Sequence, residues 1–205
     1  LFKQIISYDI VKLGLLAFFI NFIIECCSRR SIFEGLKYLG GRPLVFIYNA
    51  LLIMLTLTIA LLCKRRAFAL TVISTVWIGF GVVNGIVLSN RVTPFTAVDF
   101  TMIKSGLELA KTYMSMWQLV LIFIGFAALI VSYIAVFVYV PKLKGKVKYK
   151  RALITIFSVA IILSVYTKTC LSSNLLSGYF GNIADAYLEY GFPYSFTNTL
   201  INTGI

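Results

Sequence analysis

Residues 44–63, LVFIYNALLIMLTLTIALLC, form a run of 20 positions without a single charged side chain. Pro43, a residue type that is common at the first position of helices, precedes the run, and Lys64, Arg65 and Arg66 follow it. At a rise of about 1.5 Å per residue, a helix needs about 20 apolar residues to cross the hydrocarbon core of a bilayer. The run therefore predicts a membrane-spanning helix that ends at a short basic loop.

Four further apolar stretches resemble this run in composition. They cover residues 10–26, 67–89, 117–140 and 152–167. Together with the first run they predict an all-α membrane protein with five transmembrane helices. On this interpretation residues 1–170 form the transmembrane domain, and residues 171–205 form an extracellular juxtamembrane segment and the start of a linker.

The composition of the whole chain supports a membrane environment. Of the 205 residues 60% are hydrophobic and 13% are charged, whereas soluble domains are about 45–50% apolar and about 25% charged. The net charge of +12 would suggest nucleic acid as a partner in a soluble protein. Here the basic residues flank apolar runs, which is typical of loops that meet lipid headgroups, so we expect no nucleic-acid partner.

The distribution of these basic residues predicts the orientation. With five spans, the loop 64–66 and the loop 142–151, which carries six basic residues and no acidic one, lie on the same side. Basic loops favour the cytoplasmic side of a membrane. The sequence therefore predicts an N-terminus inside the cell and a C-terminus outside.

The outer segment between the third and fourth spans, residues 90–116, is predicted to contain an amphipathic helix. Thr93 provides a capping hydroxyl and Pro94 would occupy the first helical position. From there to Lys111, apolar residues recur at helical spacing, and charged residues share the opposite face. This helix is too charged to cross the membrane, so we expect it to lie in the outer interface.

Two other segments carry local signals. In the third span Gly81 and Gly85 form a small-xxx-small pattern, which predicts close packing against a neighbouring helix, with Asn84 as a candidate hydrogen-bonding anchor across helices. In the tail, residues 182–190 suit a short helix, residues 191–194 would break it, and residues 197–204 suit a linker. The tail aromatics predict a belt at headgroup level: Tyr179, Phe180, Tyr187, Tyr190, Phe192, Tyr194 and Phe196.

Candidate binding residues lie near the outer ends of the spans. Glu25 is one helical turn before Arg29, which suits either a helix-end ion pair or a polar patch shared with a lipid headgroup. Guanidinium groups can hold phosphate with two parallel hydrogen bonds, but interface arginines are also common as plain anchors. The outer arginines are Arg29, Arg30, Arg42 and Arg91.

Arg91 and Asp99 flank the loop that begins at Thr93. The pair suits either a tether within the loop or a surface that faces the active groove of a partner domain. The chain has no histidine, its four cysteines form no CxxC pair, and it contains no nucleotide-binding loop, serine-nucleophile motif or zinc-protease motif. We therefore expect no catalytic centre, metal site or cofactor in this chain.

Four segments resemble the N-terminal membrane domain of lipoteichoic acid synthases and related phosphoglycerol transferases of Gram-positive bacteria. They are NFIIECCSRRSIFEGLKYL (21–39), PLVFIYNALLIMLTL (43–57), NGIVLSNRVTPFTAVDF (84–100) and YGFPYSF (190–196). The third is the most specific, because hydropathy alone does not demand Arg91, Thr93, Pro94, Phe95 and Asp99.

The resemblance implies five spans in the plasma membrane and an extracellular sulfatase-like domain that is absent from this sequence. That domain would use a threonine nucleophile and a divalent metal, typically manganese, to polymerise glycerol phosphate from phosphatidylglycerol. The membrane domain would anchor it and present the lipid, with Arg91 and Asp99 as the best candidates for lipid presentation and docking.

Two other classes of protein remain as alternatives. A small lipid transporter or flippase usually shows internal repeats and charges near the bilayer midplane, neither of which the sequence displays. The other alternative is a membrane scaffold subunit.

Overall fold

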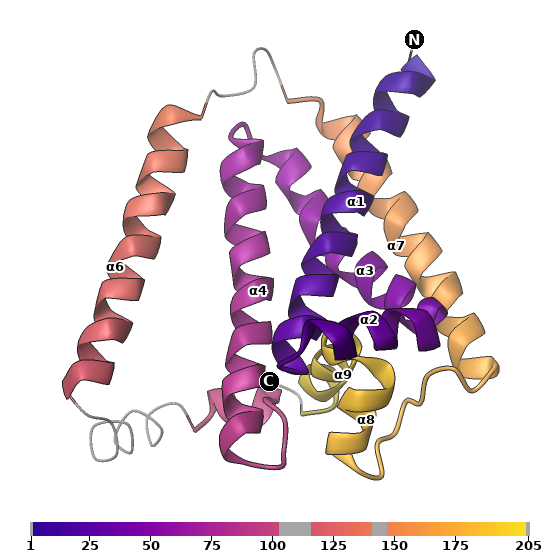
Figure 1. Cartoon of the computed structure of the whole chain (residues 1–205). Coiled ribbons are helices and arrows are strands. Elements are labelled where there is room, and N and C mark those ends of the chain that lie inside the picture. The colour runs from indigo at the N-terminus through magenta and orange to yellow at the C-terminus, as the bar shows by residue number, and fades with distance from the viewer. Residues whose placement is uncertain (1, 103–115, 141–146, 204–205) are drawn as a thin grey trace.

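The computed structural model describes residues 2–102, 116–140 and 147–203, and within them every regular element is helical. Figure 1 shows the long helices and a group of short ones. The long helices are α1 (Phe2–Ser28), α3 (Pro43–Thr58), α4 (Arg66–Asn90), α6 (Met116–Tyr139) and α7 (Tyr149–Ser172). The short elements are α2 (Ile32–Gly41), α8 (Ile183–Tyr190), α9 (Phe192–Thr203) and the 3-10 turns η1 (Ile59–Leu62) and η2 (Ala97–Phe100).

Four helical segments of the described chain are long and apolar enough to cross a membrane. They are Ile10–Ser28, Pro43–Leu62, Arg66–Asn90 and Tyr149–Ser172, and α6 contributes a shorter apolar stretch, Phe123–Tyr139. The predicted all-helical class is confirmed, and the four segments are those of a membrane-embedded protein. Each of the five predicted apolar runs lies within helical structure, with ends that differ from the prediction by a few residues.

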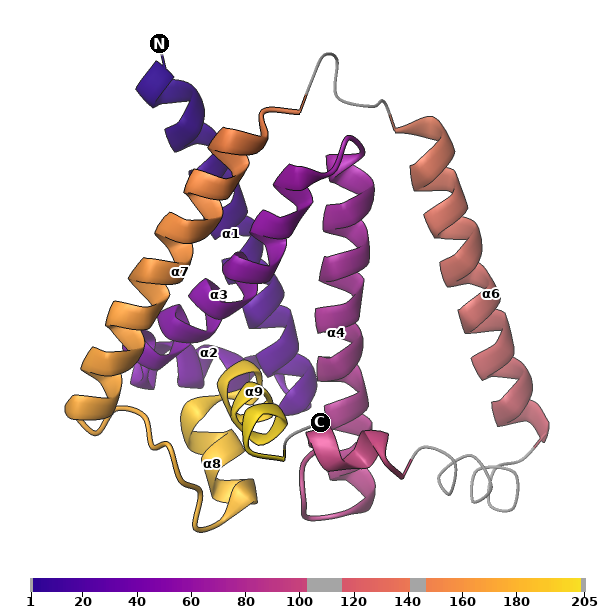
Figure 2. The same ribbon diagram turned by 180° about the vertical axis from the view of Figure 1, so that it is seen from behind.

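Helix α3 lies at the centre of the bundle, against α1, α4 and α7 (Figure 2). Phe46, Ile53 and Leu57 on this helix are fully buried. The Tyr48 hydroxyl lies 3.0 Å from the Thr167 hydroxyl of α7, which adds a polar contact between these two helices. Contacts on several sides of α3, among them the hydrogen bond from Asn49 to the backbone of Tyr190, hold it in this position.

The predicted glycine contact between helices is confirmed. A Cβ atom built on Gly81 would lie 3.0 Å from the Cα of Ile24 in α1, and one on Gly85 would overlap the carbonyl oxygen of Cys27. The backbones of α1 and α4 therefore approach as closely as glycine permits. Asn84, however, does not bond across helices as expected. Its side-chain oxygen accepts the backbone N–H of Phe95 at 2.8 Å, because the chain folds back over the end of α4.

The helix predicted to begin at Thr93 does not begin there. Residues 91–96 are irregular, and the 3-10 turn η2 follows them, with Thr96 as its capping residue. The hydroxyl and backbone N–H of Thr96 both donate to the carboxylate of Asp99. The capping residue therefore lies three residues later than predicted. The remainder of the predicted amphipathic helix, residues 103–115, lies outside the described residues, as do residues 141–146 of the second basic loop.

The tail differs most from the prediction. Gly191 does interrupt the chain, with a φ of 79°, but residues 192–203 then form the helix α9 instead of a linker. Pro193 sits in the first turn of this helix, where its missing N–H costs little. Four of the seven aromatics assigned to a headgroup belt are instead buried inside the protein: Tyr187, Phe192, Tyr194 and Phe196.

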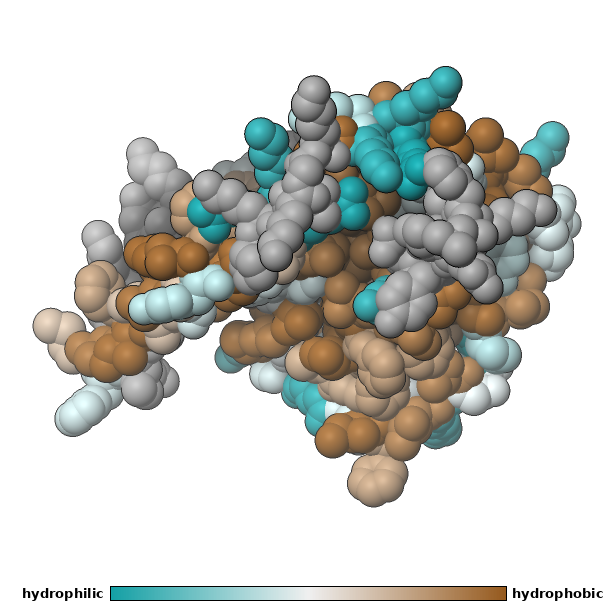
Figure 3. All heavy atoms as spheres, turned by 90° about the horizontal axis from the view of Figure 1, so that it is seen from above, coloured by the Kyte–Doolittle hydropathy of each residue, from teal (hydrophilic) through white to brown (hydrophobic). Residues whose placement is uncertain are grey.

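Helix α6 stands apart from the other long helices. It contacts α4 near the basic loop, where Phe68 packs edge-on against Tyr133 and Phe137. Seen from the end that carries the N-terminus, α6 extends from the rest of the molecule as a separate arm with a brown, apolar surface (Figure 3). An apolar surface of this kind is stable when lipid is the solvent.

Candidate functional site at one end of the bundle

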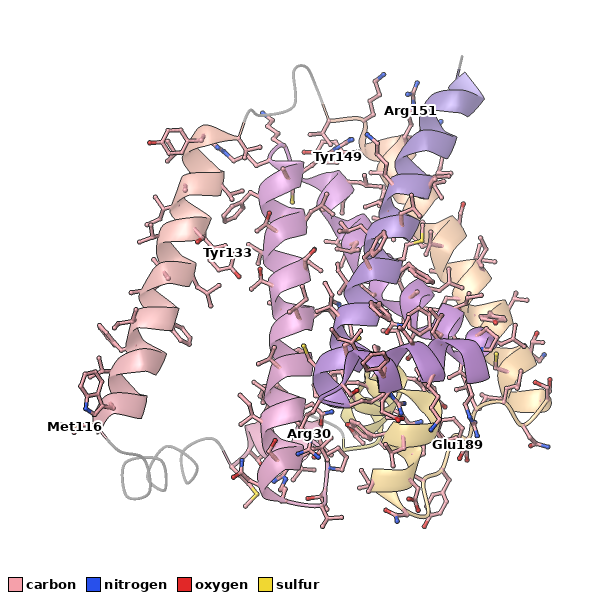
Figure 4. All side chains as sticks on the ribbon, in the orientation of Figure 1. Arg30, Met116, Tyr133, Tyr149, Arg151 and Glu189 are labelled. Atoms are coloured by element: carbon pink, nitrogen blue, oxygen red, sulfur yellow. The ribbon has the colours of Figure 1, made fainter. Side chains whose placement is uncertain are left out.

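Segments that are distant in sequence meet at one end of the bundle. Helices α2, α8 and α9 and the loop after α4 gather there, at the end opposite to the N-terminus (Figures 1 and 2). Figure 4 shows Arg30 and Glu189 at this end and Tyr149 and Arg151 at the other. The candidate residues chosen from the sequence all lie at the first of these two ends.

Glu25, near the end of α1, is the most deeply buried acid at this end. Its side chain is 1% exposed, and one carboxylate oxygen accepts the Nε–H of Arg29 at 3.1 Å. The other accepts the backbone N–H of Phe192, the first residue of α9, at 2.8 Å. Arg29 also donates to the carbonyl oxygen of Leu188 and stacks over the Tyr38 ring at 4.1 Å. The expected ion pair therefore forms, and it also fastens α8 and α9 to α1.

Asn49 of α3 makes a second connection to the tail, which the sequence did not predict. Its amide nitrogen donates to the carbonyl oxygen of Tyr190, and its oxygen accepts the N–H of Tyr194, each at 2.7 Å. Between these contacts Gly191 has no room for a side chain, because a Cβ atom would lie 2.8 Å or less from Asn49, Tyr38 and Glu25. A carboxamide in an otherwise apolar span was the signal that could have revealed this site.

Arg91 and Asp99 form the tether that was one of the two interpretations of this pair. Nη2 of Arg91 lies 2.8 and 2.7 Å from the two carboxylate oxygens. The same guanidinium donates to the carbonyl oxygens of Thr93 and Pro94, so it fixes the loop from inside. Partial burial raises the pKa of Asp99, but hydrogen bonds from Arg91 and Thr96 outweigh it and hold this pKa below its usual value.

The fixed loop also contacts α8. The Tyr187 hydroxyl donates to the carbonyl oxygen of Phe95 at 2.8 Å, and the Phe95 ring stacks on Phe196 of α9 with centroids 5.8 Å apart. Burial raises the pKa of Tyr187 above its usual value, so this hydroxyl stays protonated and remains a donor. Loop, α8 and α9 therefore form one packed unit on the ends of α1, α3 and α4.

A cavity of about 480 Å³ lies between the ends of α1 and α4 and helix α8. Four of the six candidate residues line it, namely Glu25, Arg29, Arg30 and Arg91. Thr93 and Asp99 do not line it; both contact Arg91 from the side of the loop. Arg42, the remaining outer arginine, lies elsewhere and pairs with Glu189 at 2.9 Å.

The cavity is lined by both charged and apolar side chains. Three arginines line it, together with Glu25, Glu34 and Asp185. Within residues 2–102, 116–140 and 147–203, no three His, Cys, Asp or Glu side chains are grouped so that they could hold a metal ion. Guanidinium groups at a membrane surface suit phosphate or carboxylate ligands.

Comparison with models of known protein families, with curated proteins and with solved structures gives no match to this chain.

Proposed function

We propose that this chain is the membrane domain of a phosphoglycerol transferase similar to lipoteichoic acid synthases. In this proposal five helices cross the plasma membrane of a Gram-positive bacterium, with the N-terminus inside and the C-terminus outside. An extracellular catalytic domain, which would supply the threonine nucleophile and the manganese ion, transfers glycerol phosphate from phosphatidylglycerol. The chain described here anchors that domain and positions the lipid beneath it.

One observation carries the proposal: the four segments on which the resemblance rests meet at one end of the fold. Segments 21–39 and 190–196 are joined by Glu25 and Phe192, and segments 43–57 and 190–196 by Asn49 and Tyr194. Segments 84–100 and 190–196 are joined by the stacked rings of Phe95 and Phe196. Such a meeting supports the proposal, because presentation of a lipid and docking of a catalytic domain both need their residues at one end of the bundle.

The length of α6 supports the fifth span. This helix has 24 residues, which at about 1.5 Å per residue is enough to cross a hydrocarbon core of about 30 Å. An odd number of spans places the two termini on opposite sides. The loop Lys64–Arg66 and the start of α7 then lie inside the cell, and the cavity lies outside, where a catalytic domain could reach it.

The orientation can be tested with thiols. Cys63 is exposed in the short basic loop, and Gly178, between α7 and α8, has open space where a side chain would be. In intact cells, a membrane-impermeant maleimide should label Gly178→Cys but should label Cys63 only after the membrane is made permeable. Cys63→Ser provides the background. Labelling of Cys63 in intact cells would refute the proposed orientation.

The proposed activity can be tested with the product of the complete gene, reconstituted in proteoliposomes with phosphatidylglycerol and Mn²⁺. We expect release of diacylglycerol and formation of a glycerol-phosphate polymer, both abolished by a chelator. Arg91→Ala should lower polymer formation because the loop beside the cavity loses its tether, while the protein still inserts into the membrane. Arg42→Ala is the matched control, since it breaks an ion pair outside the cavity at the same end. Absence of diacylglycerol release from the wild-type protein would refute the proposal.

A further inference from the structure

Arg30 differs from the other two arginines of the cavity in having an uncommitted charge. Arg29 is paired with Glu25, and Arg91 with Asp99. Arg30 has no carboxylate at ion-pair distance among the residues that the structure describes, and its one side-chain hydrogen bond there is to the hydroxyl of Ser89 at 3.3 Å. A guanidinium group at this position can accept a ligand without breaking an ion pair.

The backbone of Arg30 shows that the fold itself does not favour an arginine here. Its φ is 55°, in the left-handed region, and its N–H bonds to the carbonyl oxygen of Cys27 as α1 ends. Glycine is the residue that usually ends a helix in this conformation, because a side chain makes the conformation less favourable. An arginine at a position that suits glycine indicates a role for the side chain.

Arg30 also lies where two hollows of different character meet. On one side it lines the cavity of about 480 Å³, whose walls carry charged as well as apolar side chains. On the other it lines a shallow groove of about 270 Å³ whose walls include Cys27, Val82 and Ile86. Val82 and Ile86 are exposed on α4, so the groove opens toward the apolar surroundings of the bundle. A molecule with a phosphate between a polar head and an acyl chain matches this sequence of surfaces.

The remaining polar groups of the cavity suit a headgroup. The Ser28 hydroxyl is buried without a hydrogen-bond partner among the described residues, although the residue lines the cavity. Glu34 pairs with Lys37 at 3.7 Å, and Asp185 accepts from the side chain of Asn182 at 2.8 Å. Both carboxylates are partly compensated and can still accept hydrogen bonds from headgroup hydroxyls.

We propose that Arg30 binds the phosphate of an anionic glycerophospholipid, whose headgroup enters the cavity of about 480 Å³ and whose acyl chain lies in the groove beside α4. This inference rests on the proposed function and deepens it, because it assigns a phosphate-binding residue and an acyl-chain groove at the same end of the bundle. The binding itself needs no catalytic domain.

The test is lipid retention by the purified chain, measured by native mass spectrometry with equal amounts of phosphatidylglycerol, phosphatidic acid and phosphatidylcholine. The wild-type chain should retain the two anionic lipids in preference to phosphatidylcholine. Arg30→Gly should weaken this retention roughly tenfold, the loss expected for one charge-assisted phosphate contact. Because glycine suits the backbone at this position, the variant should be at least as thermally stable as the wild type, so a loss of binding cannot be ascribed to unfolding.

One control variant and one further test variant complete the experiment. Lys168→Gln removes a positive charge from α7 near the same end but away from the cavity, and should leave retention unchanged. Val82→Trp fills the groove, and should weaken lipid retention. Inorganic phosphate, which has no acyl chain, should not displace bound lipid at equal concentration. Equal retention by Arg30→Gly and wild type, equal retention of phosphatidylcholine, or displacement by equimolar inorganic phosphate would each overturn the inference.

The outcomes separate this inference from the proposed function. Arg30-dependent lipid retention without diacylglycerol release by the complete gene product would leave the lipid site intact and refute the transferase. Diacylglycerol release with lipid retention that does not depend on Arg30 would refute the lipid site at Arg30 and leave the proposed transferase standing.

Discussion

Helices α3 and α6 are both long and strongly apolar, yet they occupy opposite extremes of the fold. Helix α3 packs against the long helices α1, α4 and α7 and against the short helices α2 and α9, and it contains fully buried residues such as Phe46 and Asn49. Helix α6 has no buried residue among its described side chains and touches α4 at one end. Hydropathy alone would not separate them.

The difference between these helices lies in small and polar residues near α3 and its neighbours. Lipid is as apolar as leucine, so apolar side chains give helices in a membrane little reason to associate. Close backbone approach and hydrogen bonds between segments provide that reason. Both are present in the packed part of the bundle. Gly81 and Gly85 let α4 approach α1 closely, and Asn49 bonds α3 to the tail.

The comparison predicts a large effect at glycine. Gly85→Leu should destabilise the fold by about 3 kcal/mol, because even the first side-chain carbon would overlap the backbone of α1. Gly125 of α6 has no other atom within 4 Å of a built Cβ, so Gly125→Leu should have little effect. Thermal unfolding in the same detergent measures both. If the two variants lose the same stability, the distinction between packed and unpacked helices is wrong.

The sequence predicts the apolar helices well because length and composition decide them within each segment. The five runs appear as helices, and the Gly81 and Gly85 contact appears where the spacing indicates it. Glu25 and Arg29 are paired as their spacing of four residues suggests. These are local signals, and one sequence is enough to detect them.

The structure of the tail could not be predicted in this way. Helix α9 owes its stability to partners far along the chain, Glu25 at its first residue and Asn49 near Tyr194. Judged by itself, the stretch 197–204 is polar and resembles a linker. The site is affected in the same way, because only the fold reveals that Arg91 is committed to Asp99 and that Arg30 is not.

A smaller effect is expected from charge at the packed end. Asp99→Asn should cost about 1–2 kcal/mol near neutral pH, because the variant loses an ion pair and weakens a capping contact. The pKa of Asp99 is lower in the fold than its unfolded value of about 3.9. Its stabilising contribution is therefore complete above about pH 4 and is lost as the pH falls through the folded pKa.

Thermal unfolding of wild type and Asp99→Asn between pH 7 and pH 3 tests this prediction. The difference in melting temperature should stay constant down to about pH 5 and shrink below about pH 4. Lys37→Gln, which breaks an exposed ion pair at the same end, is the control and should shift the melting temperature little at any pH. A difference in melting temperature that grows as the pH falls would contradict the stabilising role of ionised Asp99.

The smallest effect is expected at the contact that holds α6. Arg65 lies over the Phe137 ring at 3.9 Å, and Phe68 packs edge-on against the same ring. Phe137 is 46% exposed, so Phe137→Ala should cost only about 0.5–1 kcal/mol, the value of an exposed cation–π contact. Phe46→Ala in α3 is the matched substitution, and loss of a fully buried phenylalanine should cost about 3–5 kcal/mol. Both variants can be compared by thermal unfolding in one detergent. A loss at Phe137 as large as that at Phe46 would show that α6 belongs to the same cooperative core as α3, because only shared packing could make the two rings equivalent.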